Sequence, residues 1–273
     1  MKANLHIHST FSDGTKTIKE IDELVKKNFD VVAITDHDTV NAISEIKLLS
    51  SPVKYIIGVE MSVSYEKEII HILGYFGNNV NNEVIEYFKN EEEKLRNRCL
   101  LMIDNLKKYY QIDISYENVK KRADGIINSS HVAMEICDKY GYDFQEVYDK
   151  FLGHDKKAYV PNDCISLEDA INYLHQNNAL VVLAHPILIH KFDFNKILDM
   201  GFDGIEVYHP NQDINYQNML LKIAKEHNLI VTGGSDYHGD ILEFAIDEAY
   251  IEGDNVNIFL NKLKERELTN VRK

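Results

Sequence analysis

The chain opens with the stretch Ala3-Asn4-Leu5-His6-Ile7-His8, and Ser12-Asp13-Gly14 follows shortly after. Polar and apolar residues alternate over 3–8, which predicts a β-strand whose alternate residues share one face. His6 and His8 therefore point the same way, about 7 Å apart at ~3.3 Å per residue. Two such imidazoles can bind one metal ion, and the turn after them can bring the Asp13 carboxylate over the strand end. A lone His-x-His pair is common, so its meaning depends on the rest of the chain.

Further strands and helices alternate along much of the chain. Six more runs are strand-like, namely Val31–Thr35, Tyr55–Val63, Ile69–Phe76, Leu180–Ala184, Gly204–Tyr208 and Leu229–Thr232. Helical patterns occupy 17–27, 167–178, 213–227 and 255–266, and the first has capping-box spacing between Thr17 and Glu20. The order strand, helix, strand, helix predicts an α/β fold with parallel strands covered by helices.

The middle of the chain follows a different pattern. Between about residues 78 and 157 we find only helical periodicity, at 82–110, 129–139 and 144–151. We therefore predict a core made of residues 1–77 and 158–273. Residues 78–157 are predicted to form a helical insertion, or cap, packed on that core.

Six of the seven predicted strands carry polar side chains with oxygen or nitrogen donors at or near their ends. They are His6 and His8, then Asp36, His37 and Asp38, then Glu60, His71 and His185, and finally Asp236 and His238. Singly, each histidine could be a hydrogen-bonded core residue, Asp236 a turn former, and Glu60 the partner of a lysine. As a set they predict a multinuclear metal site, because strand carboxyl ends converge in α/β folds. Imidazole and carboxylate without thiolate favour Mn²⁺, Fe²⁺ or Zn²⁺.

Composition limits the classes of partner. The 273 residues are 44% hydrophobic and carry a formal net charge of −14, which opposes binding to long duplex nucleic acid. A small phosphorylated substrate held by metal ions remains compatible with that charge. Three widely spaced cysteines indicate neither a disulfide framework nor a thiolate zinc site. We find no apolar run of ~20 residues and no signal-peptide pattern, so we expect no membrane contact and a cytoplasmic location.

Together these motifs resemble the PHP (polymerase and histidinol phosphatase) family. The resemblance rests on the motifs already quoted, joined by Thr35-Asp36-His37-Asp38, Gly58-Val59-Glu60, Ala184-His185-Pro186 and Gly234-Ser235-Asp236-Tyr237-His238. Gly204-Ile205-Glu206-Val207-Tyr208-His209 and the insertion are similar to the stand-alone phosphoesterases of that family. The resemblance implies a distorted (β/α)₇ barrel that holds up to three divalent metal ions, with manganese expected and iron or zinc as alternatives.

The resemblance also implies a role for each polar residue. His6, His8, Glu60 and Asp236 would hold the first metal; Asp13, His37 and His238 the second; Glu60 as a bridge, His71 and His185 the third. Asp36 and Asp38 would orient His37 and its neighbours. Proton transfer by His185 or His238 is conceivable, although both are assigned as ligands.

The implied activity is phosphoester hydrolysis by a hydroxide that the metals hold. The expected substrates are nucleoside 3′,5′-bisphosphates or the 5′ ends of short oligoribonucleotides. Histidinol phosphate is the alternative within this chemistry, and a non-catalytic metal-binding module is the alternative of another class. A metal-dependent amidohydrolase would ordinarily need a bridging lysine, and no predicted strand ends in one.

Two positions depart from the pattern of the stand-alone relatives. This chain has Ser129, and later Ile187 and Leu188, where such relatives often carry basic residues. Both are positions for a phosphate clamp, since arginine binds phosphate through two hydrogen bonds. Lys191, or Lys156 and Lys157, could substitute, and His131 could line the pocket.

Overall fold

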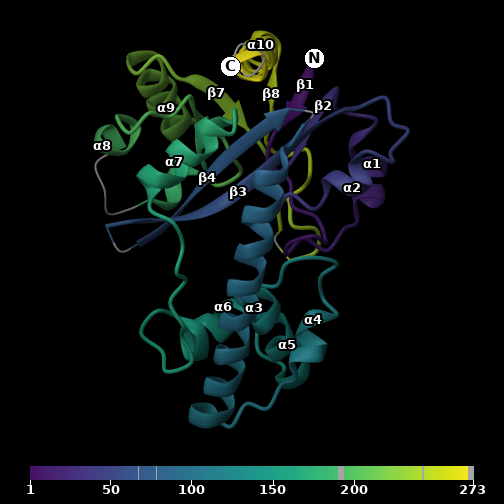
Figure 1. Ribbon diagram of the computed structural model, residues 1–273, viewed down its shortest axis with the longest axis vertical. Coiled ribbons are helices and arrows are strands. Elements are labelled where there is room, and N and C mark those ends of the chain that lie inside the picture. The colour runs from purple at the N-terminus through teal and green to yellow at the C-terminus, as the bar shows by residue number, and fades with distance from the viewer. Residues whose placement is uncertain (67, 78, 190–193, 242, 270–273) are drawn as a thin grey trace.

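The structure, a computed structural model, describes residues 1–66, 68–77, 79–189, 194–241 and 243–269. Its centre is one eight-stranded sheet in the order β7-β6-β5-β4-β3-β2-β1-β8 (Figure 1). The strands are β1 (Lys2–Asn4), β2 (Val31–Ile34), β3 (Lys54–Tyr65), β4 (Glu68–Gly77), β5 (Leu180–Leu183), β6 (Gly204–Tyr208), β7 (Ile230–Gly233) and β8 (Ile251–Glu252). The seven predicted strands are present, and the two-residue β8 is too short for any sequence pattern to reveal.

Strand direction differs from the prediction in one place. Strands β1 to β3 are parallel, as are β5 to β7, but β4 runs antiparallel to both of its neighbours. Only two residues separate Tyr65 at the end of β3 from Glu68 at the start of β4. A parallel crossover needs a dozen or more residues, so this connection can only be a hairpin. The prediction of an all-parallel sheet is therefore wrong at β4.

The sheet nearly closes into a barrel where the start of the chain meets the segment after β7. Strand β1 ends at Asn4, not at His8 as predicted, because the following residues change partner. Leu5 N donates to Gly233 O at 3.1 Å, and Asp236 N donates to His6 O at 2.9 Å. A Cβ on Gly234 would lie 2.3 Å from the Cβ of His6, so only glycine permits this approach. The mixed α/β barrel expected from the sequence is confirmed.

Helices cover the barrel and close one end of it. They are α1 (Ile18–Val25), α2 (Ile43–Ile46), α7 (Leu167–Gln176), α8 (Phe194–Leu198), α9 (Ile214–Glu226) and α10 (Asp254–Thr269), with a 3₁₀ turn η2 (Pro186–Leu188). The predicted capping box of α1 is present, since Thr17 and Glu20 bond reciprocally. On α10, the buried ring of Phe259 packs edge to face on Tyr75, with ring centroids 5.1 Å apart. Helices α2 and α8, of four and five residues, were not predicted.

The middle of the chain forms a helical body at the end of the barrel opposite α10 (Figure 1). It contains α3 (Asn82–Tyr110), α4 (Tyr116–Lys120), α5 (Ser129–Tyr140), α6 (Phe144–Val147) and a π-helical turn, η1 (Tyr148–Leu152). Helix α3 belongs to both bodies: Val84 and Phe88 pack in a barrel-side core, whereas Met102 and Leu106 pack in a separate cluster with α5 and η1. The division of the chain at residues 78 and 158 stays a prediction.

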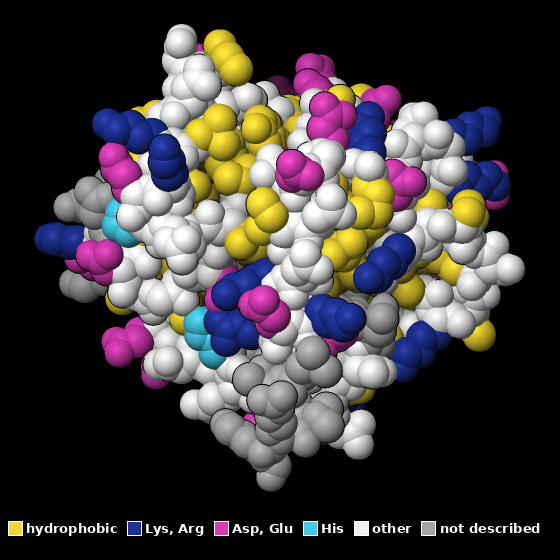
Figure 2. Space-filling model, turned by 90° about the horizontal axis from the view of Figure 1, so that it is seen from above, with side chains coloured by type: hydrophobic (Ala, Val, Ile, Leu, Met, Phe, Trp, Pro, Cys, Tyr) yellow, Lys and Arg dark blue, Asp and Glu magenta, His cyan; other side chains and the backbone are white. Residues whose placement is uncertain are grey.

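The face of the molecule at the α10 end carries charges of both signs. Figure 2 shows the face at the α10 end, where Lys and Arg side chains are interspersed with Asp and Glu. That face therefore offers no continuous basic surface to a nucleic-acid duplex. Within the part of the chain that the structure describes, no helix combines the length and apolarity needed to cross a membrane.

Candidate metal centre

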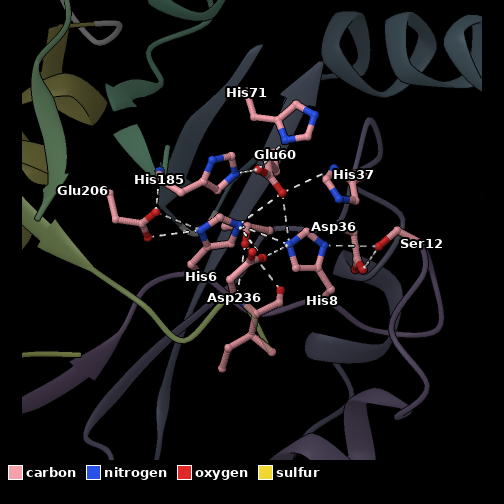
Figure 3. A network of polar contacts seen from close by, with 12 residues as sticks. His6, His8, Ser12, Asp36, His37, Glu60, His71, His185, Glu206 and Asp236 are labelled. Carbon is pink, nitrogen blue, oxygen red and sulfur yellow. Dashed lines mark hydrogen bonds and ion pairs between the residues drawn. The ribbon is translucent and has the colours of Figure 1, made fainter. Parts of the chain in front are cut away.

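The Glu60 carboxylate lies at the middle of the site, fully buried on β3 (Figure 3). Five imidazoles surround it, those of His6, His8, His37, His71 and His185. Glu60 Oε1 lies 2.7 Å from His185 Nε2 and 2.9 Å from His71 Nδ1. Glu60 Oε2 lies 3.1 Å from Nε2 of both His6 and His8. The two oxygens thus face two different sets of histidines, which is the arrangement of a bridging ligand.

Three overlapping groups of side chains have donor atoms within 4.8 Å of one another. They are His8, Asp13, His37 and His238; His6, His8, Glu60 and Asp236; and His37, Glu60 and His71. The structure therefore brings all nine residues predicted as ligands into one cluster, with His185 attached through Glu60. His8 and His37 each belong to two groups, whereas the sequence assigned each of them to one.

The donor set fits divalent cations. Asp13 Oδ1, Glu60 Oε2 and Asp236 Oδ1 are buried and accept no hydrogen bond within the described residues. His6 Nδ1 lies 3.1 Å from Glu206 Oε1, which fixes its proton there and leaves a lone pair on Nε2. That lone pair faces His8 Nε2 at 3.1 Å. Buried carboxylate oxygens and imidazole lone pairs that face one another are costly unless a cation lies between them.

Glu206 is a functional residue that the sequence reasoning missed. It is fully buried on β6, where it accepts from His6 Nδ1 and from the backbone N–H of His185, the latter at 2.8 Å. Such contacts hold a ligating imidazole in one orientation and tautomer. A carboxylate between Ile205 and Val207 in a buried strand was the available signal, as it was for Glu60. His209, which was not predicted as a ligand, lies with Nε2 3.4 Å from Asp236 Oδ2.

Asp36 and Asp38 have partners other than the predicted one. Asp36 accepts from the hydroxyls of Ser9 and Ser12, both at 2.6 Å, so it orders the loop that leads to Asp13. Asp38 accepts from the backbone N–H and hydroxyl of Ser62 on β3. Burial raises the pKa of Asp38 to about 6. Neither carboxylate has a described hydrogen bond to His37, and Asp36 reaches the neighbouring His8 only through the Ser12 hydroxyl, so their role in orienting His37 and its neighbours stays a prediction.

Metal removal is expected to make stability strongly dependent on pH. Burial disfavours the charged form of His238, but Asp13 and Asp236 outweigh it and raise its pKa to about 9. Below pH ~6.5 the raised pKa makes its whole contribution to the free energy of unfolding of the metal-free protein. This contribution is lost as the pH rises to about 9. It is worth roughly 3 kcal/mol at most, or a fall in Tm on the order of 10 °C.

Thermal melts of chelator-treated protein between pH 6 and 9.5 measure this fall. Metal-loaded protein should lack it, because a proton and a cation compete for the same lone pair. In the metal-free variant His238→Asn the fall should be smaller, because the contribution of His238 is missing while His6 and His71, whose pKa values are also raised, keep theirs. A fall of wild-type size in His238→Asn would contradict the assignment.

A cavity of about 310 Å³ lies between the metal centre and the cap. The centre contributes Asp13, His37 and His71 to its wall, and the cap side contributes Arg98, Asn128, Ser129, Tyr148 and Tyr159 among others. Arg98, on α3, is the only lysine or arginine in the described wall. Its Nε donates to Val160 O at 2.8 Å, and no described residue binds its two terminal nitrogens. Sequence reasoning missed Arg98 because the turn of α3 that faces the centre depends on how the cap docks.

Of the two residues predicted to bind substrate, His131 and Lys191, the structure describes only His131. His131 is buried, lies outside the cavity wall, and accepts from Asn128 N as part of the N-terminal cap of α5. Lys191 falls outside the described residues. Lys156 pairs with Asp155, and neither it nor Lys157 is among the wall residues.

The two positions that lack basic residues are also placed. Ser129 lies in the cavity wall, where its Oγ accepts from the Tyr148 hydroxyl at 3.2 Å. Ile187 and Leu188 lie in the short turn η2 after His185, and Leu188 is half exposed. Hydroxyl groups therefore stand in the cavity wall at the position of Ser129. Apolar side chains follow His185 at the position of Ile187 and Leu188.

Comparison with known proteins agrees with this geometry. Residues 4–179 match the PHP domain. The chain is 31% identical over 249 residues to the 5′-3′ exoribonuclease Rnm of Escherichia coli, covering 86% of this chain and 84% of that protein. It is 28% identical over 250 residues to the 3′,5′-nucleoside bisphosphate phosphatase of Chromobacterium violaceum, covering 86% of each.

A solved structure extends the agreement to three dimensions. The crystal structure of a Bifidobacterium adolescentis protein, assigned as a metal-dependent phosphoesterase, superposes with a TM-score of 0.82 at 25% identity. The match covers 95% of this chain and 96% of that one. The fold, the clustered donors and these relatives lead to one conclusion: the chain belongs to the PHP domain family and is a metal-dependent phosphoesterase.

Proposed function

We propose that this enzyme hydrolyses either phosphate monoesters of small nucleotides, namely nucleoside 3′,5′-bisphosphates, or the 5′ ends of short oligoribonucleotides. The observation that carries the proposal is the cavity that joins the metal centre to Arg98. Its volume is at the lower end of the ~300–1,000 Å³ typical of small-molecule sites, which suits one nucleotide. The names of the two curated relatives are consistent with substrates of this kind.

The proposed site has a separate binding position for each of two phosphate groups. The scissile phosphate would lie at the nine clustered residues, which we propose hold up to three divalent ions, with Mn²⁺ the expected metal. Arg98 would bind the second phosphate, or the next phosphate of an RNA strand, through its terminal nitrogens. Tyr148 and Tyr159 in the wall offer aromatic faces for a base.

When bound, divalent ions supply Lewis-acid polarisation of the phosphoryl oxygens and lower the pKa of water. The residues of the chain then have defined tasks. Glu206 and Glu60 hold the rings of His6 and His185 in fixed orientations. For proton transfer to the leaving group we assign no residue, because neither His185 nor His238 is among the residues that line the cavity.

The alternatives fit the cavity less well. Histidinol phosphate carries an ammonium group, which the Arg98 guanidinium would repel. A non-catalytic module would not need a cavity that opens beside Asp13, His37 and His71. Within the described residues, no lysine forms an ion pair with Asp13, Glu60 or Asp236, which disfavours a lysine-bridged amidohydrolase centre.

The test is a substrate panel on protein stripped of metal and reloaded with Mn²⁺, Fe²⁺ or Zn²⁺. The panel contains a nucleoside 3′,5′-bisphosphate, a 5′-phosphorylated RNA trimer, its DNA counterpart and histidinol phosphate. We expect one of the first two to have the highest kcat/KM, and activity to vanish with chelator. A higher kcat/KM for histidinol phosphate than for any nucleotide would overturn the proposed substrate class. Bound metal without hydrolysis of any substrate in the panel would favour the non-catalytic module.

A further inference from the structure

The cap reaches the metal centre through Asn128, the residue that precedes α5. Asn128 Nδ2 donates to Asp13 Oδ2 at 3.0 Å. Within the described residues, this is the one hydrogen bond or ion pair between residues 79–157 and the nine clustered residues. Asn128 is therefore placed to affect the centre from the cap side.

Helix α5 holds the Asn128 side chain in one orientation. As the N-cap residue, its Oδ1 accepts from Ser130 N at 2.9 Å. Its backbone N–H donates to His131 Nδ1 at 3.1 Å. With Oδ1 engaged by the helix, the amide nitrogen can point only away from it, toward Asp13.

The backbone beside Asn128 is docked on the loop that carries Asp13. Asp124 N donates to Thr10 O at 2.8 Å, and Ile126 N donates to Phe11 O at 2.9 Å. A Cβ on Gly125 would lie 2.5 Å from Phe11 O, so this approach requires glycine. The cap segment and the Asp13 loop thus form one hydrogen-bonded unit.

Asp13 divides its two oxygens between the cap and the centre. While Oδ2 accepts from Asn128, the buried Oδ1 accepts no described hydrogen bond. Oδ1 lies 3.4 Å from His238 Nε2 and 3.9 Å from His37 Nε2. The Asn128 bond therefore selects which oxygen of Asp13 faces the imidazoles.

We propose that Asn128 is a positioning residue that orients Asp13 for metal binding, so that docking of the cap and metal affinity at the group of His8, Asp13, His37 and His238 are linked. This inference rests on the metal centre of the proposed function. Linkage is reciprocal: a bound metal should also tighten the docked cap segment.

The direct test is Asn128→Ser, measured by Mn²⁺ binding under chelator competition. Serine caps a helix about as well as asparagine but has no amide donor to reach Asp13. Loss of such an orienting bond typically weakens metal affinity about 10–100-fold, and we expect a loss of this size for one metal equivalent only. The metal-free variant should keep the circular dichroism spectrum of the wild type, because α5 keeps its N-terminal cap.

The matched control is Asn81→Ser. Asn81 caps α3 in the same way, accepting from Val84 N at 2.9 Å, but it does not contact the centre. This variant should bind metal like the wild type. If Asn128→Ser also binds all its metal with wild-type affinity, the inference is wrong. If the wild type itself binds no metal, the proposed function fails instead.

Hydrogen exchange gives a second test that a purely structural role of Asn128 would not satisfy. In the wild type, adding Mn²⁺ should slow exchange of the Ile126 amide, which bonds Phe11 O. In Asn128→Ser the same addition should slow it much less. Equal slowing in both proteins would overturn the linkage between cap and metal.

Discussion

Glu60→Gln is expected to lower kcat/KM for the preferred nucleotide by at least about 100-fold, since losing a mere orienting partner already costs 10–100-fold. Glutamine keeps the shape of the side chain but replaces one oxygen by an amide donor. Oε1 and Oε2 of Glu60 each lie near two or more histidines, so the amide group would face imidazole nitrogens at whichever of the two positions it takes. The bridge between the histidine sets is thereby lost whichever way the amide turns.

Metal analysis separates this loss from misfolding. Glu60→Gln should retain less metal than the wild type after dialysis while keeping its circular dichroism spectrum. The control is Glu135→Gln, a buried carboxylate of the cap that accepts from Asn118 and Arg122. It should bind metal normally even if it is less stable. Wild-type activity in Glu60→Gln would refute the bridging role.

Arg98→Met should lower kcat/KM for a nucleoside 3′,5′-bisphosphate about 10–100-fold, because hydrogen bonds to charged groups contribute ~1.5–3 kcal/mol. Methionine preserves much of the stem, so the loss isolates the guanidinium. A substrate with a single phosphate should lose much less, since Arg98 would have no second phosphate to bind. Steady-state kinetics on the two substrates measures the difference.

The same helix provides a matched control for Arg98→Met. Arg96 is half exposed and pairs with Glu93, and it does not line the cavity. Arg96→Met should leave kcat/KM for both substrates unchanged. If Arg98→Met lowers activity on the two substrates equally, Arg98 does not bind the second phosphate.

The sequence predicted the site better than its surroundings, for a physical reason. Metal ligands must be particular side chains at strand ends, so His6, His8 and Glu60 become recognisable as candidates when residue type and alternation are considered together for the whole set of strand ends. Glu206 had the same signal as Glu60, a carboxylate in a buried strand, but it was quoted only as part of a family motif and was given no role.

Features set by packing between distant segments were harder to predict. Arg98 is one of several cations on a long helix, and only the docked cap determines which of them faces the cavity. The antiparallel β4 follows from a short connection that the helix-strand alternation elsewhere obscured. The change of partner after Asn4 depends on Gly233 and Tyr237, more than two hundred residues away.

The seam between the first strand and the segment after β7 has a consequence for the newly made chain. His6 O accepts from Asp236 N, so two members of one donor group come from opposite ends of the sequence. A nascent chain would expose His6 and His8 early but would lack Asp236 and His238 until more than two hundred further residues have been made. Contacts this distant in sequence form slowly. Tight metal capture would therefore mark a chain whose barrel is correctly closed.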